Sequence, residues 1–467
     1  MSTPAQNTYD EFRYNNLPIL QTHPSRLCVL GKLAGLAPAP VETCRVLELG
    51  TSEAANIIGM AVTLPDAQFT GVDLAREPLA RGQRVIDDLG LRNVRLLRMN
   101  LLEIDESLGE FDYILTHGIY GWTPREVGAK VLEIAQRCLT GDGIAFVSYN
   151  TYPSGHIRKL VRDMTLYHVG RFENPVERLR HARAFLKVLA LGRPEADPFD
   201  AAAADYARVL LEHTDSALFH DDLAPVYEPV HFHEFVAHAK AHGLQYAGEA
   251  SGYDTPRNIR PEALEAVRDM ATGDAIAEQQ YLDFLRMRGF RKSLLCHEEK
   301  KLEAEWDASR IVGCYATTAA NEDPDGAFSS ADHIRLTTTH PVPIEYMRRL
   351  IESRPVALEV GPEQAHVALE LFKVGIIELQ ATPGIAVVAG DKPCASPLVR
   401  YQATNGVSPV TTLSHRAIEI EGEDARRMLT LLDGTRDRAA LCQAMNCSGD
   451  RLDTELRMLG RLGMLVA

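Results

Sequence analysis

A short loop with residues that can do chemistry runs from Glu48 to Asn56, between an expected strand and an expected helix. A helix N-terminus presents free backbone N–H groups, and Gly50 lets a ligand approach the chain closely. Asp73 ends the next expected strand, where a carboxylate can accept hydrogen bonds from both hydroxyls of a ribose. These features predict a nucleoside-binding crevice at the carboxyl end of a sheet.

The elements that must position this loop alternate between short apolar runs and helical patterns. The expected strands are 45–50, 68–73, 94–99, 111–116 and 143–149, and the expected helices between them are 54–64, 76–89 and 124–138. Strands separated by helices are joined by crossovers, which produce a mostly parallel sheet with both faces covered. The segment therefore predicts a doubly wound, Rossmann-like α/β domain.

The rest of the chain is expected to add further units. Residues 151–230 are rich in helix formers and lack strand-like alternation, which predicts a helical insertion. Two later strand patterns, at 244–248 and 290–296, are expected to close the first sheet, with membership of a separate helical domain as the alternative for either. A β-rich stretch follows, and the chain ends with an apolar helix, a glycine and a short strand, a pattern that suits a winged-helix-like unit.

Composition and charge argue against several classes of protein. The 49 basic and 64 acidic residues give a net charge of -15, and a duplex-binding surface depends on neutralising phosphates, so we expect no nucleic acid partner. No apolar stretch approaches the roughly 20 residues that span a bilayer, and the N-terminus lacks a secretory pattern. The 8 cysteines contain no C-x-x-C pair, which favours free thiols in a cytoplasmic protein without membrane insertion.

The loop after the first expected strand resembles the E/D-x-G-x-G-x-G loop of class I S-adenosylmethionine methyltransferases. Glu48 and Gly50 match this motif, whereas Ser52 and Ala54 replace its other glycines and fit there if φ stays negative. A nicotinamide-binding loop would need glycines at positions 52 and 55, which the chain lacks. The resemblance implies S-adenosyl-L-methionine as the cofactor and S-adenosyl-L-homocysteine as the product.

Other segments resemble bacterial methyltransferases with a methyltransferase regulatory domain, among which are protein-lysine methyltransferases of outer-membrane proteins. The similar segments are 116–124, 147–153, 161–168, 229–235, 242–249, 290–297 and 432–441. The resemblance runs from about Tyr9 to the C-terminus and implies a class I core, a middle α+β domain and a winged-helix-like C-terminal domain. The expected boundaries are 1–40 for an N-terminal arm or lid, 41–155 for the cofactor-binding core, 156–300 for the helical insertion and regulatory region, 301–395 for the middle domain and 396–467 for the C-terminal domain.

By position in this resemblance, the loop surrounds the methionine part of the cofactor. Glu48 is expected to receive the cofactor's ammonium, directly or through water, with Gly50 beside it. Asp73 is expected to hold the ribose, and Asn100 to bond an edge of the adenine. The full expected cofactor-binding set is Glu48, Gly50, Thr51, Ser52, Asn56, Asp73, Leu74, Asn100, Leu101 and His117.

The methyl acceptor is expected beside the loop after the fourth strand, which contains His117, Tyr120 and Trp122. This loop differs from the N/D-P-P-Y motif of enzymes that methylate planar amide or exocyclic nitrogens. An aromatic pocket can instead enclose an aliphatic ammonium by cation–π contact. Tyr9 and Tyr14 are expected in an N-terminal lid. The expected substrate-binding residues are Tyr14, Tyr120, Trp122 and Asn150, with ordinary packing as the alternative.

Proton transfer is less specified by the sequence. Tyr149, Tyr152 and His117 are candidates for the general base, and none of them is favoured. Methyl transfer from a sulfonium needs alignment and a dry site but no metal. The histidines His231, His233, His238 and His242 lack a third ligand and an H-E-x-x-H pattern, so we expect no metal site.

These expectations lead to one favoured function and two alternatives. The favoured function is S-adenosylmethionine-dependent methyl transfer to lysine amines of a protein or peptide partner. The second hypothesis is a small-molecule N- or O-methyltransferase, in which the helical insertion roofs a closed pocket. The third is a cofactor-binding regulatory protein without turnover. The identity of the acceptor, the degree of methylation and the oligomeric state stay open.

Overall fold

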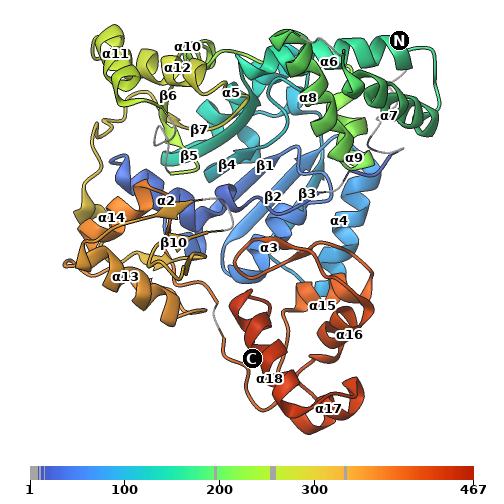
Figure 1. Ribbon diagram of the computed structural model, residues 1–467, viewed down its shortest axis with the longest axis vertical. Coiled ribbons are helices and arrows are strands. Elements are labelled where there is room, and N and C mark those ends of the chain that lie inside the picture. The colour runs from blue at the N-terminus through green and yellow to red at the C-terminus, as the bar shows by residue number, and fades with distance from the viewer. Residues whose placement is uncertain are drawn as a thin grey trace.

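A seven-stranded sheet with the order β3-β2-β1-β4-β5-β7-β6 lies at the centre of the computed structural model (Figure 1). The structure describes residues 9, 12–14, 16–193, 197–252, 259–330, 334–385 and 387–467. The strands are β1 (Arg45–Leu49), β2 (Gln68–Asp73), β3 (Val94–Arg98), β4 (Phe111–Thr116), β5 (Leu139–Asn150), β6 (Leu244–Glu249) and β7 (Phe290–His297). The first five strands are parallel, and β7 pairs antiparallel with both β5 and β6. The predicted doubly wound sheet is confirmed, including its two closing strands.

Burial on both faces explains why the central strands are nearly uninterrupted apolar runs. Every residue of β4 is buried, as expected for a parallel strand covered by helices on both sides. Successive residues of β1 alternate, so Val46 packs on one face with α3 and Leu47 packs on the other face with α5. The covering helices are α2 (Pro24–Leu33), α3 (Ala55–Thr63), α4 (Arg76–Leu89), α5 (Arg125–Cys138) and α10 (Phe232–Ala241).

The predicted helical insertion forms a lobe with its own core at one end of the sheet (Figure 1). Its helices are α6 (Ser154–Val169), α7 (Pro175–Leu191), α8 (Pro198–Glu212) and α9 (Asp215–Ala217), followed by a π-helical turn over Leu218–Asp222. Asn174 and Asp197 cap α7 and α8, and a proline follows each cap. Before the chain returns to the sheet at β7, it forms α11 (Pro261–Ala271) and α12 (Ala275–Leu285).

The chain beyond β7 forms a mixed middle region. Its strands are β8 (Tyr315–Thr317), β9 (Asn321–Glu322), β10 (Phe328–Ser329), β11 (Arg335–Leu336), β12 (Leu358–Glu359) and β13 (Glu378–Gln380), and its helices are α13 (Pro341–Glu352) and α14 (Ala365–Lys373). Phe372 of α14 and Leu379 of β13 belong to the same hydrophobic core as α3, so this region packs directly on one face of the central sheet.

The last segment forms a C-terminal module with a separate core. It comprises α15 (Pro397–Thr404), β14 (Val410–Thr411), β15 (Ala417–Ile418), α16 (Glu423–Leu431), α17 (Arg438–Met445) and α18 (Gly449–Arg461). Gly463 follows α18 with a φ of +68°, which allows the predicted turn from a helix into an extended end. The boundaries at residues 300 and 395 stay a prediction.

Two composition-based expectations concern thiols and membranes. All 8 cysteines are free, and five of them, Cys28, Cys44, Cys138, Cys296 and Cys314, are buried. Burial raises the pKa of the Cys44 thiol to about 12, which keeps it protonated. Within the described ranges, no helix combines the length and the apolar character needed to cross a bilayer.

Candidate active site

A cavity of about 880 Å³ opens where the carboxyl ends of β1, β2, β4 and β5 meet. The crevice predicted beside Gly50 and Asp73 therefore exists as a hollow in the molecule. Twelve of the sequence-predicted site residues line it, namely Tyr14, Glu48, Gly50, Ser52, Asn56, Asp73, Leu74, Asn100, Leu101, His117, Trp122 and Asn150. Thr51, Tyr120, Tyr149 and Tyr152 are outside this lining.

The loop after β1 adopts glycine-like geometry even where it lacks glycine. Gly50 has a φ of +75°. A Cβ added there would lie 2.4 Å from Ile119 Cδ1, so any larger residue at this position would clash with Ile119. Ser52 and Ala54 have φ values of +50° and +59°, so the expectation that φ stays negative at these positions was wrong. A left-handed residue other than glycine costs roughly 1–2 kcal/mol, and such strain persists where the surrounding structure imposes it.

Glu48 is buried at the base of the cavity and is held by its own loop. Its Oε1 accepts a hydrogen bond from Asn56 Nδ2 at 2.6 Å, and its Oε2 accepts one from the Thr51 hydroxyl. Burial raises the pKa of Glu48 to about 7, although both hydrogen bonds act in the opposite direction. Thr51 is only 1 % exposed, so it orients Glu48 rather than lining the cavity as expected.

Asp73 fixes the loop as well as facing the cavity. One carboxylate oxygen accepts the Ser52 N–H and the other accepts the Ala75 N–H, both at 2.8 Å. This contact helps to impose the left-handed conformation of Ser52. Asn100 accepts the Leu102 N–H through its side chain at 3.1 Å and so caps the short turn after β3.

His117 lies at the end of β4 beside a serine from β5. Gly118 N–H donates to Ser148 Oγ at 3.2 Å, so the Ser148 hydroxyl can donate in turn to His117 Nδ1 at 3.0 Å. Burial, with the nearby charge of Lys292, lowers the pKa of His117 to about 4. His117 is therefore neutral at pH 7 and a weak proton acceptor.

Tyr149 and Tyr120 pack in the core, which corrects the expectation that they face the reacting centre. Successive side chains of a strand point to opposite faces, so Asn150 reaches the cavity and Tyr149 does not. The Tyr149 ring stacks on Phe235 at 4.1 Å, and the side chain is fully buried. The Tyr120 hydroxyl lies 2.8 Å from His238 Nδ1 in the same core.

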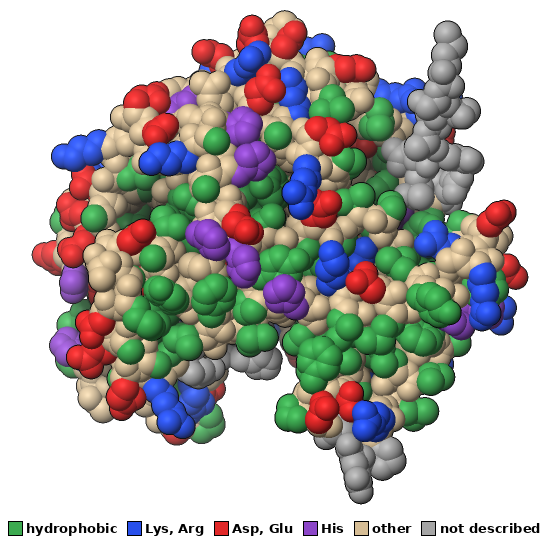
Figure 2. Space-filling model, turned by 90° about the horizontal axis from the view of Figure 1, so that it is seen from above, with side chains coloured by type: hydrophobic (Ala, Val, Ile, Leu, Met, Phe, Trp, Pro, Cys, Tyr) green, Lys and Arg blue, Asp and Glu red, His purple; other side chains and the backbone are tan. Residues whose placement is uncertain are grey.

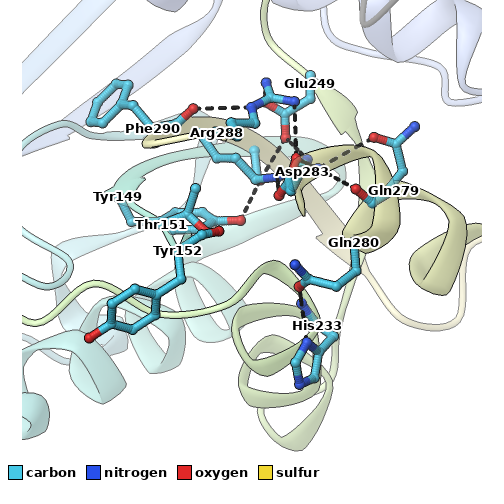
Figure 3. A network of polar contacts seen from close by, with 12 residues as sticks. Tyr149, Thr151, Tyr152, His233, Glu249, Gln279, Gln280, Asp283, Arg288 and Phe290 are labelled. Carbon is cyan, nitrogen blue, oxygen red and sulfur yellow. Dashed lines mark hydrogen bonds and ion pairs between the residues drawn. The ribbon is translucent and has the colours of Figure 1, made fainter. Parts of the chain in front are cut away.

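Tyr152 is also displaced from its expected place, because the chain turns just after β5. Its ring stacks on His156 at 4.0 Å and points away from Glu249 and Asp283 (Figure 3). His231 lies beside the same ring at 5.0 Å, and Figure 2 shows histidine side chains gathered across one face of the molecule. Among the residues that the structure describes, no group of three or more His, Cys, Asp or Glu side chains could hold a metal ion.

The helical insertion contributes cavity residues that sequence reasoning missed, and no motif marks them. Arg158 donates to Asp222 Oδ1 at 3.0 Å, and its guanidinium lies 5.0 Å from the Trp122 ring centre and 5.3 Å from that of Tyr227. An arginine of this chain therefore already lies over the Trp122 ring, while Trp122 lines the cavity, and its expected contact with a substrate ammonium stays a prediction. The other missed lining residues include Arg178, Tyr206, His220, Asp221, Gly289 and Lys292.

The N-terminal tyrosines cover the cavity from the side of the helical lobe. The Tyr9 ring stacks on His220 at 4.3 Å, and the Tyr14 ring meets His220 edge-on at 5.4 Å. Burial raises the pKa of Tyr9 to about 12, and the charges of Asp221 and Asp73 add to this shift. The rest of the expected lid includes residues 1–8, 10, 11 and 15, which lie outside the described residues.

Three family models match the chain. A methyltransferase domain matches residues 46–143, a predicted methyltransferase regulatory domain matches 214–297, and a PKMT C-terminal winged helix domain matches 391–451. Two proteins of Rickettsia prowazekii are similar in sequence. Uncharacterized protein RP028 is 34% identical over 50% of this chain and 94% of its own length, and RP789 is 29% identical over 94% of this chain and 85% of its own length.

Solved structures of PKMT2 from Rickettsia typhi have a similar fold. The first is 26% identical, has a TM-score of 0.84, and covers 97% of this chain and 100% of its own. PKMT2 in complex with AdoHcy is 25% identical with a TM-score of 0.82 and the same coverage. The space beside Gly50 and the carboxylates of Glu48 and Asp73 suit the same class of ligand. The chain therefore belongs to the class I S-adenosylmethionine-dependent methyltransferases that carry a methyltransferase regulatory domain.

Proposed function

We propose that this methyltransferase acts in the cytoplasm on lysine side-chain amines of proteins. The observation that carries the proposal is a carboxylate, Asp221, that lines the part of the cavity formed by the helical lobe and makes no hydrogen bond with the described residues through its side chain. The PKMT winged helix domain at residues 391–451 and the similarity to PKMT2 structures over 97% of the chain support a protein substrate. A lysine side chain has an apolar stem and a cationic end, so it suits a cleft with aromatic walls and one anionic group.

Asp221 differs from the other acidic residues of the cavity lining. Burial raises its pKa to about 6, so it is mostly ionised at pH 7. Its side chain makes no hydrogen bond with any described residue, whereas Glu48 and Asp73 each accept two. The charges of Arg158 and Arg162 act on Asp221 from nearby, but its oxygens make no hydrogen bond with the described residues and stay available to a cation that enters the cavity. Asp222, its neighbour, is already paired with Arg158.

The proposed cofactor contacts follow from the geometry of the strand ends. Glu48 receives the ammonium of the methionine end, beside the space left by Gly50, and Asp73 receives the ribose hydroxyls. Asn100, with Leu74 and Leu101, lies where the adenine would bind. Asn56 acts through Glu48, which it holds at 2.6 Å. Bound S-adenosyl-L-methionine supplies an electrophilic methyl group.

The protein's own tasks are to admit, deprotonate and align the amine. A lysine amine has a pKa near 10.4, so nearly all of it enters protonated. We propose that Asp221 pairs with the entering ammonium and accepts its proton, because the pKa of His117 lies near 4. Tyr9 and Tyr14 cover the cavity, which excludes water and disfavours the charged amine.

Transfer of a radioactive methyl group tests this function. The full chain is incubated with S-adenosyl-L-[methyl-14C]methionine and a bacterial protein extract, and the labelled protein is hydrolysed in acid. We expect the label to elute as methylated lysine. The matched control is the same extract after acetylation of its amines, which removes the acceptor without removing the proteins.

Three outcomes would contradict the proposal. Label that appears in small extractable metabolites, and not in protein, would identify a small-molecule methyltransferase. Label that stays on protein after acetylation would point to an acceptor other than lysine. Binding of S-adenosyl-L-homocysteine without any transfer would favour a regulatory protein without turnover.

A further inference from the structure

A hairpin of the C-terminal module reaches the helix that follows the cofactor loop. The hairpin consists of β14, β15 and the turn between them, and His415 lies in this turn with only 2 % of its surface exposed. Its Nε2 lies 2.8 Å from Asn56 Oδ1 at the start of α3. Figure 1 shows the C-terminal helices next to α3. Two segments that are 359 residues apart thus meet directly beneath the cavity.

A glycine in α3 makes this approach possible. A Cβ added at Gly59 would lie 2.9 Å from Thr411 Cγ2 and 3.1 Å from His415 Nδ1. Glycine in a helix interior costs about 1 kcal/mol relative to alanine. The close packing of the hairpin on α3 therefore depends on a residue that is otherwise unfavourable there.

The hydrogen bonds of Asn56 fix the direction of its amide. Asn56 Oδ1 accepts the Ile19 N–H at 2.8 Å, and Asn56 Nδ2 donates to Glu48 Oε1 at 2.6 Å and to Thr22 Oγ1 at 3.0 Å. Exchange of the amide oxygen and nitrogen would set a donor against the Ile19 N–H and an acceptor against the Glu48 carboxylate. His415 Nε2 must therefore carry the proton and donate to Asn56.

Apart from its hydrogen bond to Asn56, the conformation and burial of His415 destabilise the fold. Its φ of +58° lies in the left-handed region, and its buried Nδ1 has no hydrogen-bond partner in the described structure. An unpaired buried polar atom destabilises a fold, and so does a left-handed residue other than glycine or asparagine. Among the described residues, the only hydrogen bond of its side chain is the one to Asn56. Burial also keeps the imidazole neutral, because the pKa of His415 lies well below its usual value.

We propose that His415 is a positioning residue for the cofactor. It holds Asn56, and Asn56 holds Glu48 in the orientation that receives the methionine end of S-adenosyl-L-methionine. The C-terminal module thereby completes the cofactor site, and displacement of the hairpin by a bound protein would weaken cofactor binding. This inference rests on the proposed placement of Glu48, and it does not depend on lysine as the acceptor.

The binding of two ligands distinguishes a positioning role of His415 from a general effect on the stability of the fold. S-adenosyl-L-homocysteine contains the amino-acid end, whereas 5′-methylthioadenosine keeps the nucleoside and the thioether without it. We expect His415→Leu to weaken binding of S-adenosyl-L-homocysteine about tenfold, as loss of one buried hydrogen bond implies. Binding of 5′-methylthioadenosine should change by less than about twofold. Both affinities are measured by titration calorimetry on the full chain.

His415→Gln is the matched conservative variant, because the glutamine amide can still donate where Nε2 did. It should bring the affinity for S-adenosyl-L-homocysteine to within about threefold of the original. Equal weakening of both ligands by His415→Leu would show a structural role only and overturn the inference. Unchanged binding of S-adenosyl-L-homocysteine would overturn it as well.

A second route leaves His415 intact in case His415→Leu fails to fold. Gly59→Ala should push the hairpin from α3 and weaken the same ligand selectively. Its control is Gly128→Ala in α5, where an added Cβ would lie 3.4 Å from the Tyr120 ring, an ordinary contact distance. No selective weakening by Gly59→Ala would count against the inference.

Glu48→Gln distinguishes failure of the inference from failure of the site on which it rests. If Glu48→Gln weakens S-adenosyl-L-homocysteine selectively and the His415 and Gly59 variants do not, the placement of Glu48 stands and the inference is wrong. If Glu48→Gln is not selective either, the placement of Glu48 is wrong and the inference falls with it.

Discussion

The two ends of the active-site cavity differ in how their carboxylates are held. At the proposed cofactor end, Glu48 and Asp73 each accept at least two hydrogen bonds from described residues, and the amide of a third residue, Asn56, is bonded on both sides. At the other end, Asp221 makes no hydrogen bond with a described residue and faces the cavity. A site for one constant ligand can be prebuilt, whereas the group proposed to receive a lysine side chain has to stay available.

The two ends also come from different parts of the chain. The cofactor end is built from residues at the ends of adjacent parallel strands, which the sheet brings together by its topology. The opposite end comes from the helical insertion and from Tyr9 and Tyr14 near the N-terminus. A conserved chemical step and a variable acceptor can thus be served by separate elements of one fold.

The largest effect is expected for Asp73→Ala at the prebuilt end. This change removes the proposed ribose contacts and the anchor of the Ser52 N–H. Two charge-assisted hydrogen bonds correspond to a loss of about 100-fold or more in affinity for S-adenosyl-L-homocysteine. Titration calorimetry measures the loss, and Asp66→Ala, at an exposed aspartate before β2, is the control. An affinity within about threefold of the original would show that Asp73 does not hold the ribose.

Asp221→Asn should produce the next largest effect, and on a different quantity. The proposed pairing with the entering ammonium is lost, so kcat/KM for the protein acceptor should fall about tenfold or more. The affinity for S-adenosyl-L-homocysteine should stay within about twofold, because Asp221 is proposed to contact the acceptor and not the cofactor. The matched control is Asp205→Asn, which changes an exposed aspartate of the same helical lobe. If Asp221→Asn lowered the affinity for S-adenosyl-L-homocysteine as much as it lowers kcat/KM, the two ends of the cavity would not have separate roles.

The raised pKa of Glu48 predicts that the affinity for the cofactor depends on pH. Its pKa is raised by burial to about 7, so the ionised form that attracts an ammonium grows as pH rises. Between pH 6 and 8 the ionised fraction increases about tenfold, and affinity for S-adenosyl-L-homocysteine should follow. In the absence of ligand, this raised pKa gives stability that is present below about pH 4.5 and is lost as pH rises through about 7. Glu48→Gln should flatten the binding profile; a slope that persists in this variant would assign it to another group.

The crevice at the strand ends could be predicted from the sequence because its information is local. The apolar runs mark the strands, and the loop and Asp73 follow directly from strand ends. Alternation along β5 could also have separated Asn150 from Tyr149. Asp221 and His415 carry no such signal, because their positions depend on packing between segments far apart in sequence. The left-handed Ser52 and Ala54 were missed for a related reason, since contacts made by Asp73 and by the turn override the intrinsic preference of these residues.

The smallest effect on activity is expected for Tyr149→Phe, which tests the boundary of the cavity. The Ser293 hydroxyl donates to Glu249 at 3.0 Å, so the Tyr149 hydroxyl donates to Ser293, also at 3.0 Å, within the core. Loss of this buried bond should lower the free energy of unfolding by about 1 kcal/mol, measured by denaturant titration. Methyl transfer should stay within about twofold, since the phenyl ring still stacks on Phe235.

Tyr167→Phe is the matched control for this change, because Tyr167 is 91% exposed and its hydroxyl should contribute nothing to either measurement. A tenfold fall in turnover by Tyr149→Phe with unchanged stability would return Tyr149 to the reacting centre, as a general base that the packing of β5 conceals. A fall in stability with turnover preserved would place the hydroxyl in the core alone. In that case strand alternation decides which aromatic residues of β5 can take part in the chemistry.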